Sequence, residues 1–412
     1  GGGGRRAGGG AGGGRAQDAR ALRSPNPPAL DGMRRSPTSH LAGALATLFL
    51  ATFLGVPLVI ILARSLAPGA DEPFGAGFLA ALTDPYYLGR VGFTLAQALL
   101  STVLTVALGF PTALLLARYR FRGKRALTAA FTVPFVMPTV VAGIGFLALV
   151  GPRGVLGVDL RNTLALVLLA HVFYNFAVVA RMVSGFLEGV APRLEGAAAT
   201  LGATPWRVML RVTLPLAAPA TLAAALLVFL FCFTSFGVVL ILAPAPTFAT
   251  LEVEVYRLSA RLLDLDAAAA LAVLQLALLL VVGFVYTRLQ ERMAVSVAPG
   301  DATRRPRGPE RLLIVGVLIV TGALVLGPLG ALVVRSLGAP NGAWPSARNY
   351  ASLLAPASTV GFTGLWNALR NSLLFAGASA TLALTVGFLF SHAIVRGKWR
   401  WLDQASLLPL VV

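Results

Sequence analysis

The feature that most constrains this chain is a series of long apolar runs that almost lack charged side chains. A bilayer core about 30 Å thick is crossed by roughly 20 apolar residues as a helix, because a helix pairs its own backbone polar groups. The eight runs that meet this requirement lie near 41–63, 91–117, 126–150, 163–187, 217–243, 267–287, 312–334 and 371–395. A ninth begins near 402. The sequence therefore predicts an all-α, polytopic membrane protein.

The net charge of +18 follows from basic residues placed between these runs. If the N-terminus is cytoplasmic, 25 of the 34 Lys and Arg residues fall on the cytoplasmic side, which is the bias that membrane proteins show. We therefore predict an inner-membrane protein with a cytoplasmic N-terminus, and we interpret the charge as a topology signal rather than as nucleic-acid binding. Cys232, the single cysteine, lies inside an apolar run and is expected to be buried.

The N-terminal segment 1–40 is rich in Gly and Arg and is predicted to be disordered before the first apolar run. Met33, followed by two arginines, is expected to be the true initiator, with a genuine flexible basic tail as the alternative. The first run is too long for a signal-peptide core, so we expect it to be retained as a helix.

The second half of the chain begins to repeat the first. Arg64-Ser65-Leu66 recurs as Arg335-Ser336-Leu337, and the basic turn Arg122-Gly123-Lys124 recurs as Arg396-Gly397-Lys398. The same order and a nearly constant offset indicate two parallel six-helix halves with a pathway at their interface. We predict a first half at 41–287, a basic cytoplasmic linker at 288–311 and a second half at 312–412 that is cut short, so that the chain is a fragment of a longer protein.

The long loop 188–215, between the fourth and fifth runs, has the pattern of two short helices with a sharp joint. Residues 193–201 are rich in Ala and Leu, and Gly202 stands where a left-handed cap would end a helix. Thr204 can cap the next helix, Pro205 suits its first position, and Pro215 is expected to end it. This pattern predicts a compact elbow on the cytoplasmic surface.

This loop resembles the coupling loop of type I ATP-binding-cassette importer permeases, which carries the "EAA" signature. Gly202 is followed by nine residues and then by Val212-Thr213-Leu214-Pro215, which is the family spacing. The triplet itself departs from the pattern. It is Gly196-Ala197-Ala198, and Glu195 stands one position before the place of the usual Glu.

The resemblance implies that the loop docks on a separate cytoplasmic ATPase dimer, and that a periplasmic binding protein delivers the solute. The chain contains no GxxxxGK[ST] phosphate loop, so ATP and Mg are expected to bind only the partner. The fused halves resemble the thiamine and ferric-iron permeases. The stretches Ala170–Asn175 and Phe233–Gly237 favour the thiamine group, and thiamine, its phosphates or ferric iron are the expected solutes.

Several polar residues near the apolar runs remain open to two interpretations. His171 and Asn175 share a helix face and, with Ser235, are candidates for the pathway, although a hydrogen bond between helices explains the first two better. The set Glu252, Glu254, Tyr256 and Arg257 could meet the binding protein, but a solvated amphipathic turn is favoured. Pro134 and Pro138 indicate either a sharp bend or a simple kink.

Other function classes fit the sequence less well. No apolar run carries paired carboxylates, the three histidines lack metal-ligand spacing and there is no nucleophile elbow, so the sequence does not favour an enzyme or a resident metal. A secondary active transporter is the main alternative. It would need acidic residues inside the spans for ion coupling, and the eight runs have almost none.

Overall fold

The computed structural model describes residues 1, 37–66, 74–293, 305–306, 308–338, 344–354, 364–397, 399 and 401–402. The predictions for residues 2–36, for most of the 288–311 linker and for the ninth run lie outside the described residues. The repeat and the domain boundaries derived from it stay predictions.

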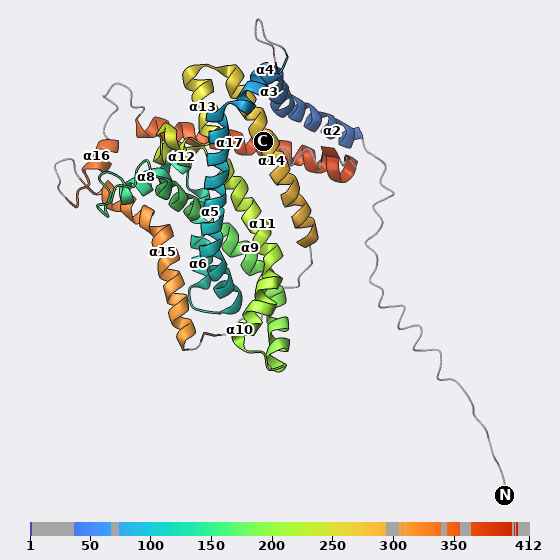
Figure 1. Cartoon of the computed structure of the whole chain (residues 1–412), viewed down its shortest axis with the longest axis vertical. Coiled ribbons are helices and arrows are strands. Elements are labelled where there is room, and N and C mark those ends of the chain that lie inside the picture. The colour runs from blue at the N-terminus through green and yellow to red at the C-terminus, as the bar shows by residue number, and fades with distance from the viewer. Residues whose placement is uncertain are drawn as a thin grey trace. The chain divides into compact units, whose positions relative to one another are not determined.

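Every regular element in the described part of the chain is a helix (Figure 1). The first group is α2 (Pro37–Leu50), the π-helical η2 (Ala51–Gly55), α3 (Val56–Leu66), α4 (Ala76–Thr83), α5 (Pro85–Arg118), α6 (Lys124–Ala130), α7 (Val133–Val136) and α8 (Thr139–Val150). The second is α9 (Leu164–Thr200), α10 (Pro205–Val208), the π-helical η3 (Met209–Thr213), α11 (Leu214–Phe233) and α12 (Gly237–Leu242). The last is η4 (Pro246–Phe248), α13 (Leu251–Tyr256), the π-helical η5 (Arg257–Leu262), α14 (Leu265–Met293), α15 (Pro309–Ser336), α16 (Arg348–Leu354) and α17 (Leu365–Gly397).

Seven of the described helical segments are long and apolar enough to cross a membrane, and one bent pair makes an eighth. Their bounds are Thr38–Leu66, Pro85–Arg118, Leu164–Glu188, Pro205–Phe233, Leu265–Leu289, Glu310–Ser336 and Leu365–Gly397, with Lys124–Val136 plus Thr139–Val150 as the bent pair. Each coincides with one of the eight predicted runs, which confirms the polytopic helical fold.

Two of the predicted runs are broken, the first of them at the prolines that predicted either a sharp bend or a simple kink. In the run 126–150, α7 and α8 meet at 105°, which is a sharp bend rather than a simple kink. The cause is Pro138, because a residue before proline is driven out of the helical region, and Met137 is extended at ψ 109°. In the run 217–243, α11 ends at Phe233 and α12 begins only at Gly237.

The residues divide into two compact units, the first made of 1–51 with 377–407 and the second of 52–376 with 408–412. In the first unit, α2 packs on the end of α17 through a cluster that includes Ala42, Ala46 and Ala393. Three small residues at this contact allow the two helix backbones to approach closely.

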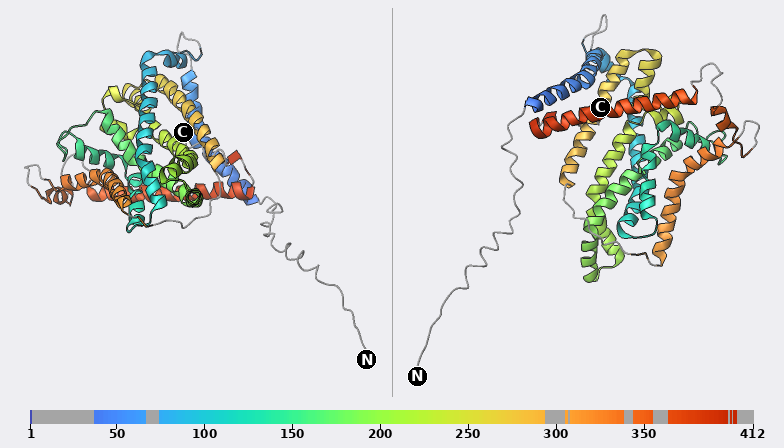
Figure 2. Two further views of the ribbon diagram at one scale, coloured as in Figure 1. Left: turned by 60° about the horizontal axis from the view of Figure 1, so that its bottom comes forward. Right: turned by 180° about the vertical axis from the view of Figure 1, so that it is seen from behind.

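The centre of the second unit is the packing of α5, α9 and α11, which run side by side (Figure 1, Figure 2). The core cluster joins Ala98 and Ala113 of α5 to Val179 of α9 and Val228 of α11. Gly109 is needed at this contact, since a Cβ there would lie 2.7 Å from the Cβ of Val179. α9 is the most buried of the candidate spans, so the residues that it carries are fixed by helices on several sides.

Candidate functional site

The coupling segment, residues 188–215, begins differently from the prediction. The expectation of two short helices is wrong, because the first arm is the end of α9, which continues without a break from the membrane span to Thr200. The run of Ala and Leu residues extends the helix that precedes it, since nothing in the sequence ends the helix before Gly202.

Gly202 forms the joint as predicted. Its φ is +81°, and the Ala203 amide donates to the Ala198 carbonyl at 3.1 Å while the Gly202 amide donates to Ala199 at 3.0 Å. This left-handed cap satisfies carbonyls that the end of a helix leaves free. A Cβ at Gly202 would meet nothing within 4 Å. The position therefore requires glycine for its backbone conformation and not for space.

The second arm begins at α10 as expected, but it does not end where expected. The Thr204 hydroxyl accepts from the Arg207 amide at 3.5 Å and Pro205 takes the first helical position. Pro215 was predicted to end the helix, and this is wrong. The helix passes through the π-helical η3 into α11, where the Leu214 amide reaches the Met209 carbonyl five residues back. The wider turn accommodates a proline that has no amide donor.

Glu195 points toward the protein interior and belongs to a three-residue cluster. Arg118 at the end of α5 approaches the Glu195 carboxylate at 2.5 Å and the Thr213 hydroxyl at 2.9 Å, and Thr213 donates to Glu195 at 2.6 Å. The Arg118 and Glu195 side chains are 24% and 20% exposed, and Thr213 is buried. The cluster ties both arms of the coupling segment to α5, and sequence reasoning missed it because the partners are distant along the chain.

Large apolar side chains of the coupling segment face outward around the joint. Leu201 is 87% exposed and Trp206 is 70% exposed. Leu194, Leu210 and Leu214 are also exposed, as are Gly196 and Ala197 of the triplet position, whereas Ala198 and Val212 are partly covered. Exposed apolar groups gathered in this way are typical of a protein-binding surface.

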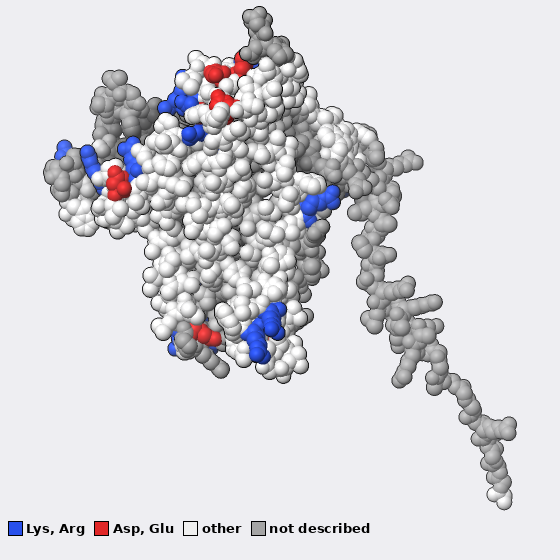
Figure 3. Space-filling model, viewed as in Figure 1, with Lys and Arg blue, Asp and Glu red and all other residues white. Residues whose placement is uncertain are grey.

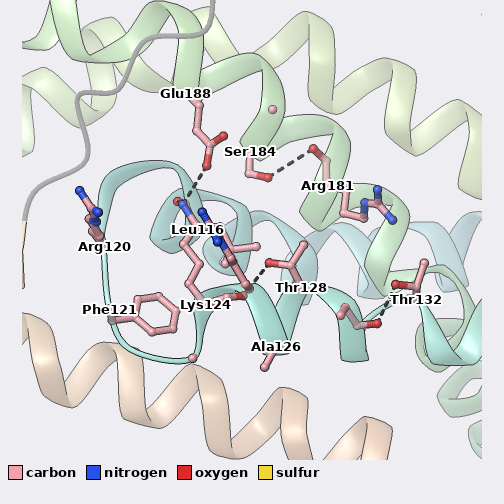
Figure 4. A pocket seen from close by; sticks show the side chains of 14 residues that line it. Leu116, Arg120, Phe121, Lys124, Ala126, Thr128, Thr132, Arg181, Ser184 and Glu188 are labelled. Carbon is pink, nitrogen blue, oxygen red and sulfur yellow. Dashed lines mark hydrogen bonds and ion pairs between the residues drawn. The ribbon is translucent and has the colours of Figure 1, made fainter.

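A large basic cavity lies where α5 ends, between α6 and α9, and the sequence analysis did not predict it. Its volume is about 1170 Å³, and Figure 4 shows Lys124 turned toward Glu188 across it. Lys124 donates to Glu188 at 2.9 Å and to the Leu116 carbonyl at 2.5 Å. Arg120, Arg125 and Arg181 also line it and make no ion pair with any residue that the structure describes. Only the basic turn at 122–124 could have indicated it from the sequence.

His171, Asn175 and Ser235, the candidate pathway residues, lie together at a second cavity of about 300 Å³. His171 bridges three segments, since its Nδ1 lies 2.8 Å from the Ser101 hydroxyl and its Nε2 lies 2.8 Å from the Ser235 hydroxyl. The Asn175 amide donates to the His171 carbonyl at 2.9 Å and contacts the Cys232 sulfur at 3.5 Å. The predicted bonding between helices and the burial of Cys232 are confirmed. A role in the pathway stays a prediction.

The segment 244–266 is not the solvated turn that we favoured. Glu254 is fully buried and pairs with Arg257 at 2.5 Å. Arg257 also donates to the Tyr86 hydroxyl at 3.0 Å, and Tyr86 donates to Glu254 at 3.3 Å. Burial raises the pKa of the neighbouring Glu252 to about 7, against a smaller opposite effect of its hydrogen bond from Gln275. This segment is therefore anchored to the beginning of α5.

Two helical spans that lead into a joint capped by glycine, with apolar side chains exposed around it, match the coupling segment that the sequence predicted for an importer permease. Residues 109–295 match the family described as "Binding-protein-dependent transport system inner membrane component". The chain belongs to this family of ABC importer permeases, whose members are transport subunits that work with a separate ATPase.

The relatives include thiamine and sulfate permeases. The chain is 27% identical over 394 residues to the thiamine transport system permease protein ThiP of Haemophilus influenzae, covering 91% of this chain and 68% of the relative. It is 32% identical over 370 residues to ThiP of Brucella abortus, covering 86% and 66%. It is 31% identical over 273 residues to the sulfate transport system permease protein CysT of Escherichia coli, covering 64% and 96%. The chain thus spans about two thirds of the length of these thiamine permeases.

The fold is shared with a solved transporter. A chain of a bacterial ABC transporter involved in the import of the acidic polysaccharide alginate aligns with a TM-score of 0.51 and 17% identity. The alignment covers 62% of this chain and 96% of that one. At this identity the match supports the permease fold and carries nothing about the solute.

Proposed function

We propose that this chain forms a transmembrane pathway of an ATP-driven importer that carries thiamine or a thiamine phosphate into the cytoplasm. The observation that carries the proposal is the coupling segment, in which a left-handed Gly202 joint stands beside the exposed Leu201 and Trp206. The solute is proposed from the ThiP relatives, which are thiamine transport system permease proteins. These relatives are not described as transporters of ferric iron, the other solute expected from the sequence, and we do not propose it.

In this proposal the coupling segment docks on a cytoplasmic ATPase dimer. Because the segment follows the fourth span, the N-terminus then lies on the same, cytoplasmic side of the membrane. ATP and Mg bind the partner, and closure of that dimer moves the segment. Because α9 continues unbroken from the span to Thr200, a displacement of the joint is transmitted along a rigid helix rather than absorbed by a loop. The two permease halves then alternate between outward and inward access.

A periplasmic binding protein delivers the solute at the opposite end of α5. Support comes from the solved alginate transporter, which was crystallised in complex with its periplasmic protein loaded with an alginate pentasaccharide. At this end the segment 244–266 is anchored by the buried Glu254, which gives an approaching protein a firm surface.

The experiment that tests the proposal is uptake by proteoliposomes that contain the assembled transporter. The internal compartment holds ATP and Mg, and the thiamine-binding protein and labelled thiamine are added outside. We expect uptake that needs internal ATP and the binding protein and that persists when a protonophore removes the ion gradient. Uptake that stops with the protonophore and continues without ATP would instead establish the secondary transporter.

A further inference from the structure

The two helix breaks of the second unit open onto the same cavity. Phe135 and Thr139 flank the bend between α7 and α8, while Thr234 and Ser235 belong to the gap between α11 and α12, and all four line the 300 Å³ cavity beside His171. The breaks are in close contact, because a Cβ on Gly237 would lie 3.1 Å from the Thr139 methyl group. The bend inside one span and the gap that follows the α11 span therefore meet at one point.

A helix that is broken inside a membrane costs free energy, so the meeting of the two breaks needs an explanation. Inside a bilayer an interrupted helix exposes backbone polar groups, and this is tolerated where those groups line a cavity or are buried in protein. Interrupted helices in transporters are accordingly the best indication of where a solute binds. The cavity is also held rigidly, since His171 joins Ser101 of α5 to Ser235 at the break.

The walls of this cavity are aromatic and carry no formal charge among the described residues. Four rings line it, those of Phe135, Tyr174, Phe231 and Phe236. Phe135 comes from the bent span and Phe231 from α11, and their ring centroids lie 6.1 Å apart in an edge-to-face arrangement. Aromatic faces attract cations, by about 0.5 to 2 kcal/mol per ring, and groups of such rings recognise organic cations in other proteins.

Polar groups in the same walls can orient a solute. The Tyr174 hydroxyl is buried without a well-formed hydrogen bond to any described residue. Asn175 uses its amide nitrogen to bond the His171 carbonyl, and its own carbonyl oxygen accepts no hydrogen bond from the residues that the structure describes. One donor and one acceptor are thus available beside the rings.

We propose that this cavity is a transient binding site for a flat, positively charged heteroaromatic solute on its way through the membrane. The inference rests on the proposed function and adds the location and the chemistry of a binding site to it. The described residues contain no group of three or more His, Cys, Asp and Glu side chains that could hold a metal ion, and an anion would be repelled by the ring faces. The absence of a carboxylate partner keeps binding weak, which a site on a transport path requires so that the solute can leave.

The binding test uses the full chain in membranes with one added cysteine, Thr234→Cys, at the cavity wall. The native Cys232 is buried, and the wild-type chain measures its own background reaction with N-ethylmaleimide. The probes are phenyltrimethylammonium and its uncharged isostere tert-butylbenzene. We expect the cation to slow modification at least threefold at a concentration where the neutral probe has little effect. Thr287→Cys, on an exposed face of α14, is the control position and should show no protection.

Ring variants then test the contact itself. Phe231→Leu keeps the apolar volume but removes the ring, and we expect it to weaken protection by the cation about 2- to 30-fold, the range that one cation–π contact covers. Phe231→Tyr keeps the ring and should retain protection, and Phe284→Leu on the exposed face of α14 should change nothing. Equal protection by both probes, or equal protection in Phe231→Leu and Phe231→Tyr, would overturn the inference. So would a Thr234→Cys thiol that does not react even without a probe, because another part of the protein would then fill the cavity.

Uptake by the assembled transporter separates this inference from the proposed function. If the wild type takes up thiamine and Phe231→Leu does so at the same rate at subsaturating concentration, the function stands and the binding site is wrong. If the wild type takes up no thiamine but the cation still protects Thr234→Cys in a ring-dependent way, the site stands and the solute is wrong.

Discussion

The two ends of α5 are each held by a cluster of charged and hydroxyl groups, and the clusters differ in how firmly they are built. At one end Arg118 joins Glu195 and Thr213 of the coupling segment. At the other end Tyr86 joins Glu254 and Arg257. Between these ends the surface along α5 is almost free of charged side chains (Figure 3).

The difference lies in burial and in what stands next to each cluster. Glu254 is fully buried although its partners Arg257 and Tyr86 are 35% and 39% exposed, whereas the Glu195 carboxylate itself is 20% exposed and Arg118 is 24% exposed. The Glu195 cluster also adjoins a glycine joint that nothing crowds. A fully buried carboxylate is costly to leave without its partner, and a partly hydrated carboxylate can change partners at moderate cost. We infer that the Glu254 cluster stabilises the fold and that the Glu195 cluster relays movement.

Removal of Arg257 should have the largest effect on stability. Arg257→Met leaves the Glu254 carboxylate buried without its charge partner, and because Arg257 itself is 35% exposed the cost should be below the roughly 3 to 5 kcal/mol of a fully buried pair. We expect a thermal unfolding midpoint that is clearly lower in detergent. Arg261→Met removes an exposed arginine from the same π-helical segment and should leave the midpoint unchanged. Equal midpoints for the two variants would show that the Glu254 cluster does not stabilise the fold.

A bulky residue at the joint should have the largest effect on coupling. Gly202→Val forces a β-branched residue to φ +81°, at a cost of about 1 to 3 kcal/mol. We expect uptake of thiamine to fall at least tenfold while the protein still inserts and the partner still hydrolyses ATP.

Gly202→Asn is the matched control, since asparagine tolerates the left-handed region better than other side chains. It should keep most of the uptake. Normal transport by Gly202→Val would contradict the assignment of this segment to coupling. Equal loss of uptake in both variants would mean that coupling requires the absence of a side chain at this position and not the left-handed backbone conformation.

Disruption of the Glu195 cluster should reduce coupling with little change in stability. Arg118→Gln and Glu195→Gln each remove one charge from a contact that is still partly hydrated. We expect each to lower the solute moved per ATP hydrolysed severalfold, and we expect the double variant to be no worse than either single variant, because both remove the same contact. Arg211→Gln alters an exposed arginine of the same segment and serves as the control. Additive losses in the double variant would contradict the relay.

The difference between the two clusters could not be derived from the sequence. The apolar runs predicted all eight spans because the bilayer imposes their length, and Gly202 could be placed because few residues other than glycine adopt its φ. Glu254 lies 168 positions from Tyr86 and Glu195 lies 77 from Arg118. Contacts at such separations depend on how helices pack, and helix period alone does not reveal them. The π-helical turn before Pro215 was missed for a different, local reason, since proline usually marks a helix boundary.

The smallest expected effect concerns Glu252, beside the buried cluster. Its pKa is raised to about 7, while in the unfolded chain it is near the ordinary 4.5. Between these values the folded protein holds a proton that the unfolded chain has lost, so stability falls as the pH rises through this range and levels off above about 7. The unfolding midpoint should therefore be higher at pH 5 than at pH 8, and the difference should shrink in Glu252→Gln, which cannot ionise. An unchanged pH dependence in that variant would mean that Glu252 is hydrated and that only Glu254 is buried at this end of α5.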